Sequence, residues 1–478
     1  MKVSSLVFAV AVMSSPALRA DTAVLQAYLK ASNTHAEDRF GGAVAVSGDT
    51  VVVGAPEESG AATGIDGDQT VRKAPNRVSS GAAYVFTRKG GKWSQQAYLK
   101  ASSPHADKFG RAVAISGDTL VVGSFWDRPG TKEGLEKGVA YVFVRNGAVW
   151  TQQARLRPAN PGIAADFGKS VAISGDTIVV GGFHETVDLA GAAFVFTRTG
   201  TEWTQQAALA AAPPVFGDGF GTSVTISADT VAVGATGEQI AGEVKKNSPS
   251  ARPFTSTGAV YVFVRDGQEW LQQAHLTAEN YGKEKTSFGG SVTASGDILV
   301  VGDHADKSGG TGTHASPKTP PRVLSGSGTA YTPTGAAYIF TRTGKNWKQD
   351  AFIKAGLPEF DNFAHSVAAS GNRVVVGAAH EGIGSGAPIA GARPTTRTEP
   401  SGATYEYTRT GSNWNPVAHL KPPNAVSGLR FGDAVAVSGD TVIVGAEFES
   451  GGTTGINGNM KDQTARFSGA AYVFQIKP

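Results

Sequence analysis

The chain has 478 residues, a length that usually corresponds to about three domains. It carries 43 Lys and Arg against 40 Asp and Glu, and this near balance excludes the strongly charged surface that binding to nucleic acid or anionic membranes requires. It has no cysteine, which excludes disulfides, thiolate metal sites and a cysteine nucleophile. Its 62 glycines are about twice the roughly 7% average and, with many Val, Thr, Tyr and Phe, predict a turn-rich β protein.

Residues 1–20 have the pattern of an export signal, MKVSSLVFAVAVMSSPALRA. One Lys is followed by an apolar stretch over about residues 3–13 and then by small residues, so that cleavage is expected after Ala17, with Ala20 as the alternative. The apolar stretch is too short to span a bilayer. We therefore expect residues 21–478 to be secreted or held in the cell envelope or periplasm, without a membrane span.

A repeated phrase starts at residue 40 and reads FGGAVAVSGDTVVVGAP. It predicts a strand, a two-residue Gly-Asp turn and a second strand that is apolar on both faces. Such a strand needs cover on both sides. Six further copies follow at intervals of 53–75 residues, beginning at Phe109, Phe167, Phe220, Phe288, Phe363 and Phe431.

Two further phrases complete each unit. A third strand such as GAAYVFTR, from Gly81, follows every copy, and an outer strand such as KWSQQAYLKAS, from Lys92, closes six of the seven. The six outer strands begin near Trp93, Trp150, Trp203, Trp270, Trp347 and Trp414, which should pack against their own or the adjacent unit. Seven such four-stranded antiparallel meanders around an axis predict an all-β, seven-bladed β-propeller.

The seventh outer strand is found at the start of the chain. Residues 25–32, LQAYLKAS, match residues 95–102 at seven of eight positions. We expect this N-terminal strand to pair with GAAYVFQI, from Gly469, and so to close the last blade and hide two sheet edges.

The recurrence of FG and, about a dozen residues later, of GAP resembles the FG-GAP repeat of the integrin α-subunit β-propeller, and still more the secreted bacterial FG-GAP proteins. The resemblance covers about residues 23–476 and implies the propeller fold and, from its relatives, a role in adhesion or carbohydrate binding. It specifies no activity, because one propeller scaffold supports many functions.

The calcium loops of integrins are not carried over. Their place is taken by a short SGDT turn, as at Asp49 and Asp118, and one carboxylate per turn cannot supply the roughly six to eight oxygens of a calcium site. We expect these Asp side chains to cap the turn, together with the Arg that ends each third strand, such as Arg88 or Arg145.

The repeats differ most in the loops that join strands 2 and 3, which should emerge on one face together with the connections between blades. Two of these loops, in adjacent blades one and seven, are near-copies that place acceptor oxygens around glycines, at Asp66, Asp68, Asn457, Asn459 and Asp462. They are candidates for ligand binding or for calcium, the one cofactor the sequence suggests. The favoured alternative is a glycine-rich loop whose Asp and Asn side chains cap their own backbone.

Three further ligand-binding candidates lie in other 2–3 loops. Trp126 could stack on a sugar, and Asp303 and His304 open the longest loop, GDHADKSGGTGTH, the best candidate for a catalytic or metal site. The sequence contains no HExxH, GxSxG or phosphate-binding loop. We therefore expect a monomeric, exported propeller that binds an extracellular protein or glycan, with no catalytic residue assigned. The alternative, a polysaccharide-active enzyme of the lyase type on the same face, is less favoured.

Overall fold

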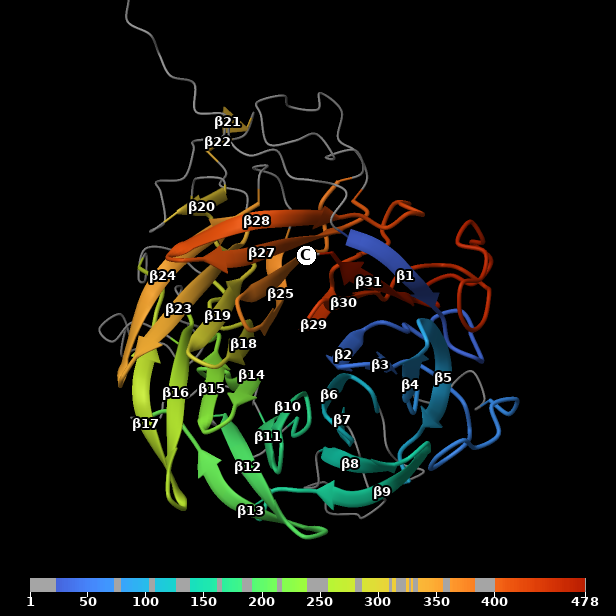
Figure 1. Cartoon of the computed structure of the whole chain (residues 1–478), viewed down its shortest axis with the longest axis horizontal. Helices are drawn as coiled ribbons and strands as arrows, with labels where there is room; N and C mark the ends of the chain where they lie inside the picture. The colour runs from blue at the N-terminus through green and yellow to red at the C-terminus, as the bar shows by residue number, and fades with distance from the viewer. Residues whose placement is uncertain are drawn as a thin grey trace, which may run out of the picture.

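The computed structural model describes residues 23–72, 79–102, 108–125, 138–160, 166–182, 191–212, 217–238, 257–279, 286–308, 312–314, 324–325, 328–329, 334–355, 362–382 and 400–477. Seven antiparallel sheets form a ring around a central opening (Figure 1). The described residues contain strands and no α-helix, so none of their segments is a helix able to cross a membrane. The predicted fold, an all-β seven-bladed propeller with four antiparallel strands per blade, is confirmed.

Each blade runs outward from an inner strand at the central opening. The strands of blades one to three are β2 (Ala43–Ser47), β3 (Thr50–Ala55), β4 (Ala82–Lys89), β5 (Lys92–Leu99); β6 (Ala112–Ser116), β7 (Thr119–Ser124), β8 (Val139–Asn146), β9 (Val149–Leu156); and β10 (Ser170–Ser174), β11 (Thr177–Gly182), β12 (Ala192–Thr199), β13 (Glu202–Leu209). Those of blades four to six are β14 (Phe220–Ser227), β15 (Thr230–Ala235), β16 (Ala259–Asp266), β17 (Glu269–Leu276); β18 (Ser291–Ser295), β19 (Ile298–Asp303), β23 (Ala336–Thr343), β24 (Asn346–Lys354); and β25 (Phe363–Ser370), β26 (Arg373–Ala378), β27 (Ala403–Thr410), β28 (Asn413–Leu420). In blade five a short strand, β20 (Gly312–His314), adds to the outer edge of β24, while β21 (Leu324–Ser325) and β22 (Gly328–Thr329) form a separate pair.

The seventh blade joins the two ends of the chain. It consists of β29 (Ala434–Ser438), β30 (Thr441–Ala446), β31 (Ala470–Ile476) and, as its outer strand, β1 (Ala23–Leu29). The first and last strands run antiparallel, with Ala23 opposite Ile476 and Leu29 opposite Ala471, and lie side by side in Figure 1. Closure by the N-terminal strand is thus confirmed.

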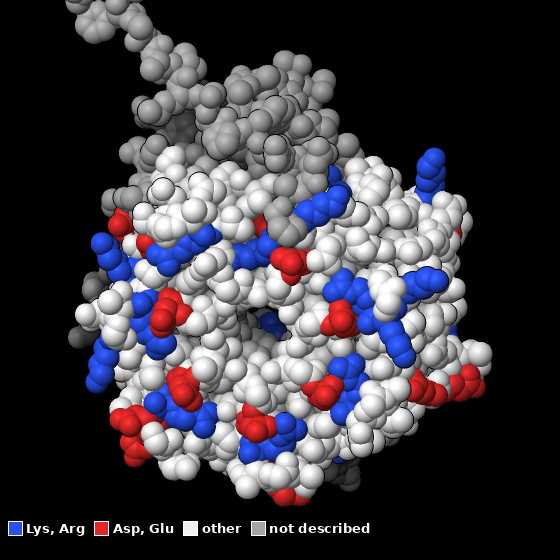
Figure 2. Space-filling model, in the orientation of Figure 1, with Lys and Arg blue, Asp and Glu red and all other residues white. Residues whose placement is uncertain are grey.

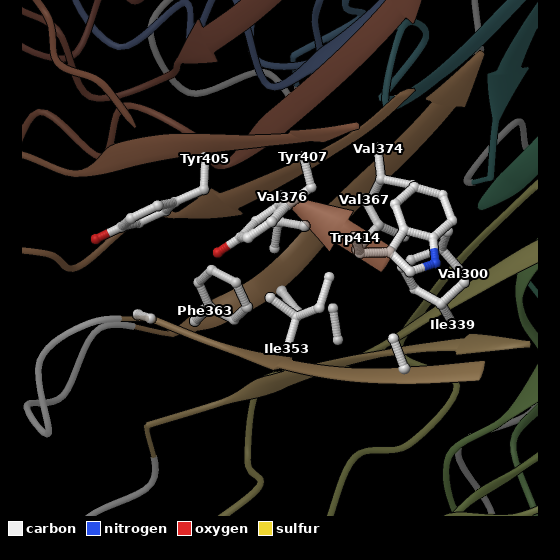
Figure 3. Close-up of a cluster of buried hydrophobic side chains, with 14 of the residues drawn as sticks. Val300, Ile339, Ile353, Phe363, Val367, Val374, Val376, Tyr405, Tyr407 and Trp414 are labelled. Carbon is white, nitrogen blue, oxygen red and sulfur yellow. The ribbon is translucent and has the colours of Figure 1, made fainter. Parts of the chain in front are cut away.

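The hydrophobic core lies between the blades. Val51 and Val53 of β3 pack toward blade seven, whereas Val52, on the other face of the same strand, packs toward blade two. Figure 3 shows the equivalent layer between blades five and six, to which Ile353 of blade five and Trp414 of blade six both belong. Because both faces of each second strand are buried in this way, no blade can bury its apolar residues without two neighbours.

The two glycines of the repeated phrase bring adjacent blades into backbone contact. A Cβ added to Gly54, the glycine of GAP in blade one, would lie 2.0 Å from the carbonyl oxygen of Gly110, the glycine of FG in blade two. Gly110 itself has a φ of +87°, which L side chains rarely adopt. The motif is therefore part of the scaffold, and it brings the inner ends of neighbouring blades together.

The outer-strand tryptophans lie at the same interfaces, as expected. The indole Nε1 of Trp150 donates to Gln96 Oε1 of the preceding blade at 2.8 Å, and the guanidinium of Arg145 lies 5.3 Å from the indole ring. The same pairing with a Gln of the preceding blade recurs at Trp203, Trp270 and Trp347.

The face that carries the 1–2 and 3–4 turns has one ion pair repeated around the ring. Arg145 Nε donates to Asp118 Oδ1 at 2.7 Å, and its second nitrogen reaches Thr50 of blade one at 2.9 Å. Equivalent pairs join Arg88 to Asp49, Arg198 to Asp176, Arg265 to Asp229 and Arg342 to Asp297. Figure 2 shows acidic and basic groups next to each other around the opening. The expected pairing of these Asp side chains with the Arg that ends each third strand is confirmed, whereas the amide of the turn glycine donates to a Ser of the preceding blade, as Gly117 does to Ser47.

Candidate ligand-binding site

The similar loops of blades one and seven each cover the outer edge of their own blade. Asp66, with a φ of +51°, exchanges two hydrogen bonds with Tyr98 of β5: its amide donates to the Tyr98 carbonyl, and its Oδ1 accepts from the Tyr98 amide, both at 2.8 Å. Asn457, with a φ of +56°, does the same with Tyr28 of β1, at 2.8 and 2.9 Å. These two side chains therefore satisfy backbone groups that an open sheet edge would leave unpaired.

The other three candidates of these loops cap turns. Asp68 Oδ1 accepts from the amide of Thr70 at 2.8 Å, and Asn459 Oδ1 accepts from the amide of Lys461 at 3.0 Å. Asp462 accepts from the Thr464 amide at 2.9 Å and the Gly452 amide at 3.1 Å. All five side chains are thus engaged within their own loop or blade, the arrangement that the glycine-rich alternative expects. Calcium binding by these loops stays a prediction.

The remaining candidates, Asp303, His304 and Trp126, do not form one site. Asp303 is completely buried, and its Oδ1 accepts from the amides of Ser287 at 2.8 Å and Ala305 at 3.2 Å. Burial, with the carboxylate of Asp306 nearby, raises the pKa of Asp303 to about 7. His304 instead lies at the inner rim, with its ring 5.4 Å from that of His365 in blade six. Trp126 lies outside the described residues.

A set of pairs between a buried carboxylate and a basic side chain was not predicted. In five blades a carboxylate lies three residues after the end of the second strand. It pairs with a Lys or His that lies on the outer strand of the same blade or directly after it. The pairs are Glu58–Lys100 at 2.5 Å, Glu238–His275 at 2.7 Å, Asp306–Lys354 at 2.7 Å, Glu381–His419 at 2.8 Å and Glu449–Lys30 at 2.7 Å.

These pairs fasten the start of each 2–3 loop to the outer strand. Although burial raises the pKa of Glu381, the nearby His419 and Lys421 outweigh it and lower that pKa to about 2. Burial likewise raises the pKa of Asp306, but the Lys354 ammonium holds it below its ordinary value. The signal was present in the sequence, since an acid recurs at this spacing in every copy, including Asp127 and Glu185 outside the described residues. The pairs are structural and hold the base of the loop face.

The inner rim of the same face is built by one four-residue turn that recurs before the inner strands. The residue before the Phe of FG has a positive φ in six blades, and in all seven the amide two residues after the Phe donates to the carbonyl of that residue. Five of these turns start at Arg39, Lys108, Asp166, Asn362 and Arg430, with donor–acceptor distances of 3.1–3.2 Å. The first and fourth residues of these turns differ from blade to blade.

Five residues of these turns and two residues that directly follow second strands, His304 and Glu447, form what we call the mouth cluster: Arg39, Arg111, His304, His365, Arg430, Asp433 and Glu447. His365 Nε2 lies 3.9 Å from Asp433 Oδ1. The guanidinium carbons of Arg39 and Arg430 lie 4.9 and 4.2 Å from the centre of the Phe448 ring. Blades one, two, five, six and seven all contribute, so that the cluster exists only when the ring is closed.

The charges of the mouth cluster shift one another's pKa values. Burial raises the pKa of Asp433 to about 6, against the opposing effect of Arg430, Arg111 and Arg39. Burial and the Asp433 carboxylate together raise the pKa of Glu447. Burial, with His365 beside it, lowers the pKa of His304 to about 4, and burial with Arg111 and Arg430 lowers the pKa of His365. At neutral pH the cluster therefore combines cationic guanidiniums with neutral imidazoles and a carboxyl pair close to taking up a proton.

The mouth cluster reaches solvent. The side chain of His365 is 44% exposed although enough protein surrounds it to lower its pKa, and that of Asp433 is 11% exposed. Within the part of the chain that the structure describes, no three His, Cys, Asp or Glu side chains lie close enough together to hold a metal ion. The arrangement can bind an anion and can exchange a proton with it.

Comparison with known families gave one match. The model of the FG-GAP repeat matches residues 24–86, 93–143, 150–196, 203–263, 270–315 and 414–474, which together make up more than half of the chain. The unmatched residues 316–413 contain the first three strands of blade six, where FG is replaced by Phe363-Ala364 and the Gly-Asp turn by Gly371-Asn372. The comparison with individually curated proteins gave no match.

Proposed function

The chain belongs to the FG-GAP repeat family, and from that premise we propose that it is an exported binding protein whose loop face takes an extracellular protein or glycan. The observation that carries the proposal is the contrast between the two faces. One face repeats the same Asp–Arg pair, whereas the other gathers unlike side chains from five blades at the mouth of the opening. Variable groups held on a rigid base are typical of binding sites.

Export is part of the same proposal. The pattern of residues 1–20 supports it, and the first strand begins at Ala23, so that cleavage after Ala17 or Ala20 leaves the closing strand intact. The mass of the protein recovered outside the cytoplasm should correspond to a chain that starts at residue 18 or 21.

The binding role is tested on arrays of glycans and extracellular proteins, with and without calcium. We expect at least one ligand to bind, and His365→Ala to weaken its binding because that exposed imidazole stands in the mouth. Lys345→Ala, an equally accessible change in the 3–4 turn of blade five, is the control and should leave binding intact. Binding that is lost in the control and retained in His365→Ala would contradict the assignment of the face.

One observation favours the second candidate, a lyase. His365 has a lowered pKa and lies near Arg111 and Arg430, so that a neutral base stands beside groups able to neutralise a substrate carboxylate. In such a β-elimination the base takes the proton next to the carboxylate, the glycosidic C–O bond breaks, and the leaving oxygen gains a proton. Acidic polysaccharides incubated with the protein would then release unsaturated products that absorb in the ultraviolet. If no such products are released, the lyase hypothesis is wrong and only the binding function remains.

A further inference from the structure

We propose that the mouth cluster is a binding site for the carboxylate of a uronate residue in an acidic polysaccharide. The inference rests on the proposed function and deepens it, because it assigns the ligand class to one site on the loop face. Four features of the structure support it in turn: the held guanidiniums, the carboxyl pair, the lack of apolar anchors, and the coupling to a proton.

The mouth cluster has three guanidiniums but only two carboxyl groups, so its arginines are not all neutralised, and two of them are held in place by an aromatic ring. The guanidinium carbons of Arg39 and Arg430 lie 4.9 and 4.2 Å from the centre of the Phe448 ring, and this contact restrains both guanidiniums. Arg111, from blade two, is exposed yet close enough to lower the pKa of His365 across the opening. Planar guanidiniums that are already oriented lose little entropy when they bind a carboxylate.

The Asp433–Glu447 pair can offer a proton donor to a carboxylate ligand. Both groups have raised pKa values, so that a protonated carboxyl can donate a hydrogen bond to an incoming carboxylate. Ionised, the same pair offsets part of the charge of the three guanidiniums and weakens their attraction for an anion. The site therefore binds a carboxylate best when the pair holds a proton.

The polar nature of the rim favours a glycan over an acidic protein segment. Among the described residues the large apolar side chains that are exposed are Val24, Val71, Val149 and Leu271, and none belongs to the mouth cluster. The nearest aromatic ring, Phe448, already contacts two guanidiniums. Protein interfaces usually need apolar or aromatic anchors, whereas imidazoles, carboxyls and guanidiniums match the hydroxyl and carboxylate groups of a uronate.

Binding should be coupled to a proton. The groups that face Asp433 are Arg39, Arg111, Arg430, Glu447 and His365. Between pH 7.5 and 5.5 the carboxyl pair gains a proton, since the pKa of Asp433 is raised to about 6, while the guanidiniums keep their charge. The mouth therefore becomes more positive as the pH falls, and affinity for a carboxylate should rise.

The test is the binding of trigalacturonate by calorimetry at pH 5.5 and 7.5, using the full mature chain. We expect tighter binding at pH 5.5, and about tenfold or greater weakening in Arg111→Gln, the loss typical of one charged hydrogen bond. Lys345→Gln changes the same charge on the opposite face and should bind as the wild type does. Asp433→Asn, which mimics the protonated carboxyl, should bind at pH 7.5 about as tightly as the wild type does at pH 5.5.

Other probes decide between the sources of the anion. Polyglutamate, inorganic phosphate and a neutral galactose trisaccharide are measured in the same way. Tighter binding of polyglutamate or phosphate than of trigalacturonate, or equal trigalacturonate binding by Arg111→Gln and wild type, would overturn the inference. Binding of a neutral glycan or a protein at the loop face without uronate binding would overturn it and leave the proposed function standing. The absence of any ligand at that face would overturn both.

Discussion

At the scale of single residues, Ala364 stands where the six other copies of the repeat have the glycine of FG. Its φ is +65°, a left-handed conformation that costs an L side chain about 1–2 kcal/mol. Its carbonyl oxygen still makes the contact with the preceding blade, because a Cβ on Gly302 would lie 2.2 Å from it. The blade therefore keeps the geometry of the motif at the expense of local strain.

Ala364→Gly should consequently stabilise the protein by about 1 kcal/mol, since relief of the strain exceeds the added freedom of the unfolded chain. The urea midpoint measures this, and it should rise without a change in slope. Gly110→Ala is the matched opposite, because the new Cβ would lie 2.1 Å from the Ala82 carbonyl oxygen. An unchanged midpoint in Ala364→Gly would show that the backbone is not strained there.

A residue that departs from the repeat in blade six supplies an ion pair that blade seven lacks. In the third strand of blade seven, Ile476 stands where the other blades have the Arg, so Asp440 has no arginine partner from its own blade. Arg373 of blade six, which replaces the usual Thr, lies 3.1 Å from Asp440 and also pairs with the buried Glu406. The Asp–Arg ring thus stays occupied at the blade where the chain ends meet.

At the scale of elements, the loops of blades one and seven work as edge covers. Ile65 forms a β-bridge with Leu99, and Ile456 forms one with Leu29, beyond the outer strand of each sheet. Blade five reaches the same result with β20, which pairs with β24. Covered edges keep the outer strands from pairing with other chains.

Asp66→Ala should therefore destabilise blade one by about 1–2 kcal/mol, through the lost hydrogen bond to the Tyr98 amide and the positive φ of residue 66. Hydrogen exchange of the Tyr98 amide should accelerate. Asp68→Ala, whose bonds are local and exposed, should change stability by less than about 0.5 kcal/mol. Stabilisation of the wild type by calcium that disappears in Asp68→Ala would favour the calcium hypothesis instead.

The difference between what could and could not be predicted follows from the repeat. Features copied in every unit, such as the strand with Val51–Val53 or the closing strand from Leu25, can be identified by comparing the sequence with itself. The mouth cluster has no such signal, because its members occupy the positions where the copies disagree. Only the closed ring shows that Arg111 and Asp433, more than three hundred residues apart, influence each other.

At the scale of the whole molecule, one strand holds the ring together. Besides its pairing with β31, the N-terminal segment supplies Lys30, whose ammonium is buried against Glu449 at 2.7 Å and also donates to Ser468 Oγ at 2.7 Å. Burial lowers the pKa of Lys30, and Glu449 opposes that shift. Because the mouth cluster draws on blades one, two, five, six and seven, the candidate site depends on this closure as much as the fold does.

Removal of residues 21–32 should therefore cause aggregation or a large loss of thermal stability. The truncation exposes the edge of β31 and leaves Glu449 buried without its cation, a change that costs about 3–5 kcal/mol in comparable cases. Lys30→Met separates the two effects, since it removes the charge and keeps the strand; it should lower the melting temperature and leave the protein monomeric. Light scattering measures the oligomeric state and calorimetry the melting temperature, and the chain that lacks only residues 1–20 is the reference. If the truncated chain stays monomeric and melts with the reference, the seventh blade is stable with three strands and the N-terminal strand is not what closes the ring.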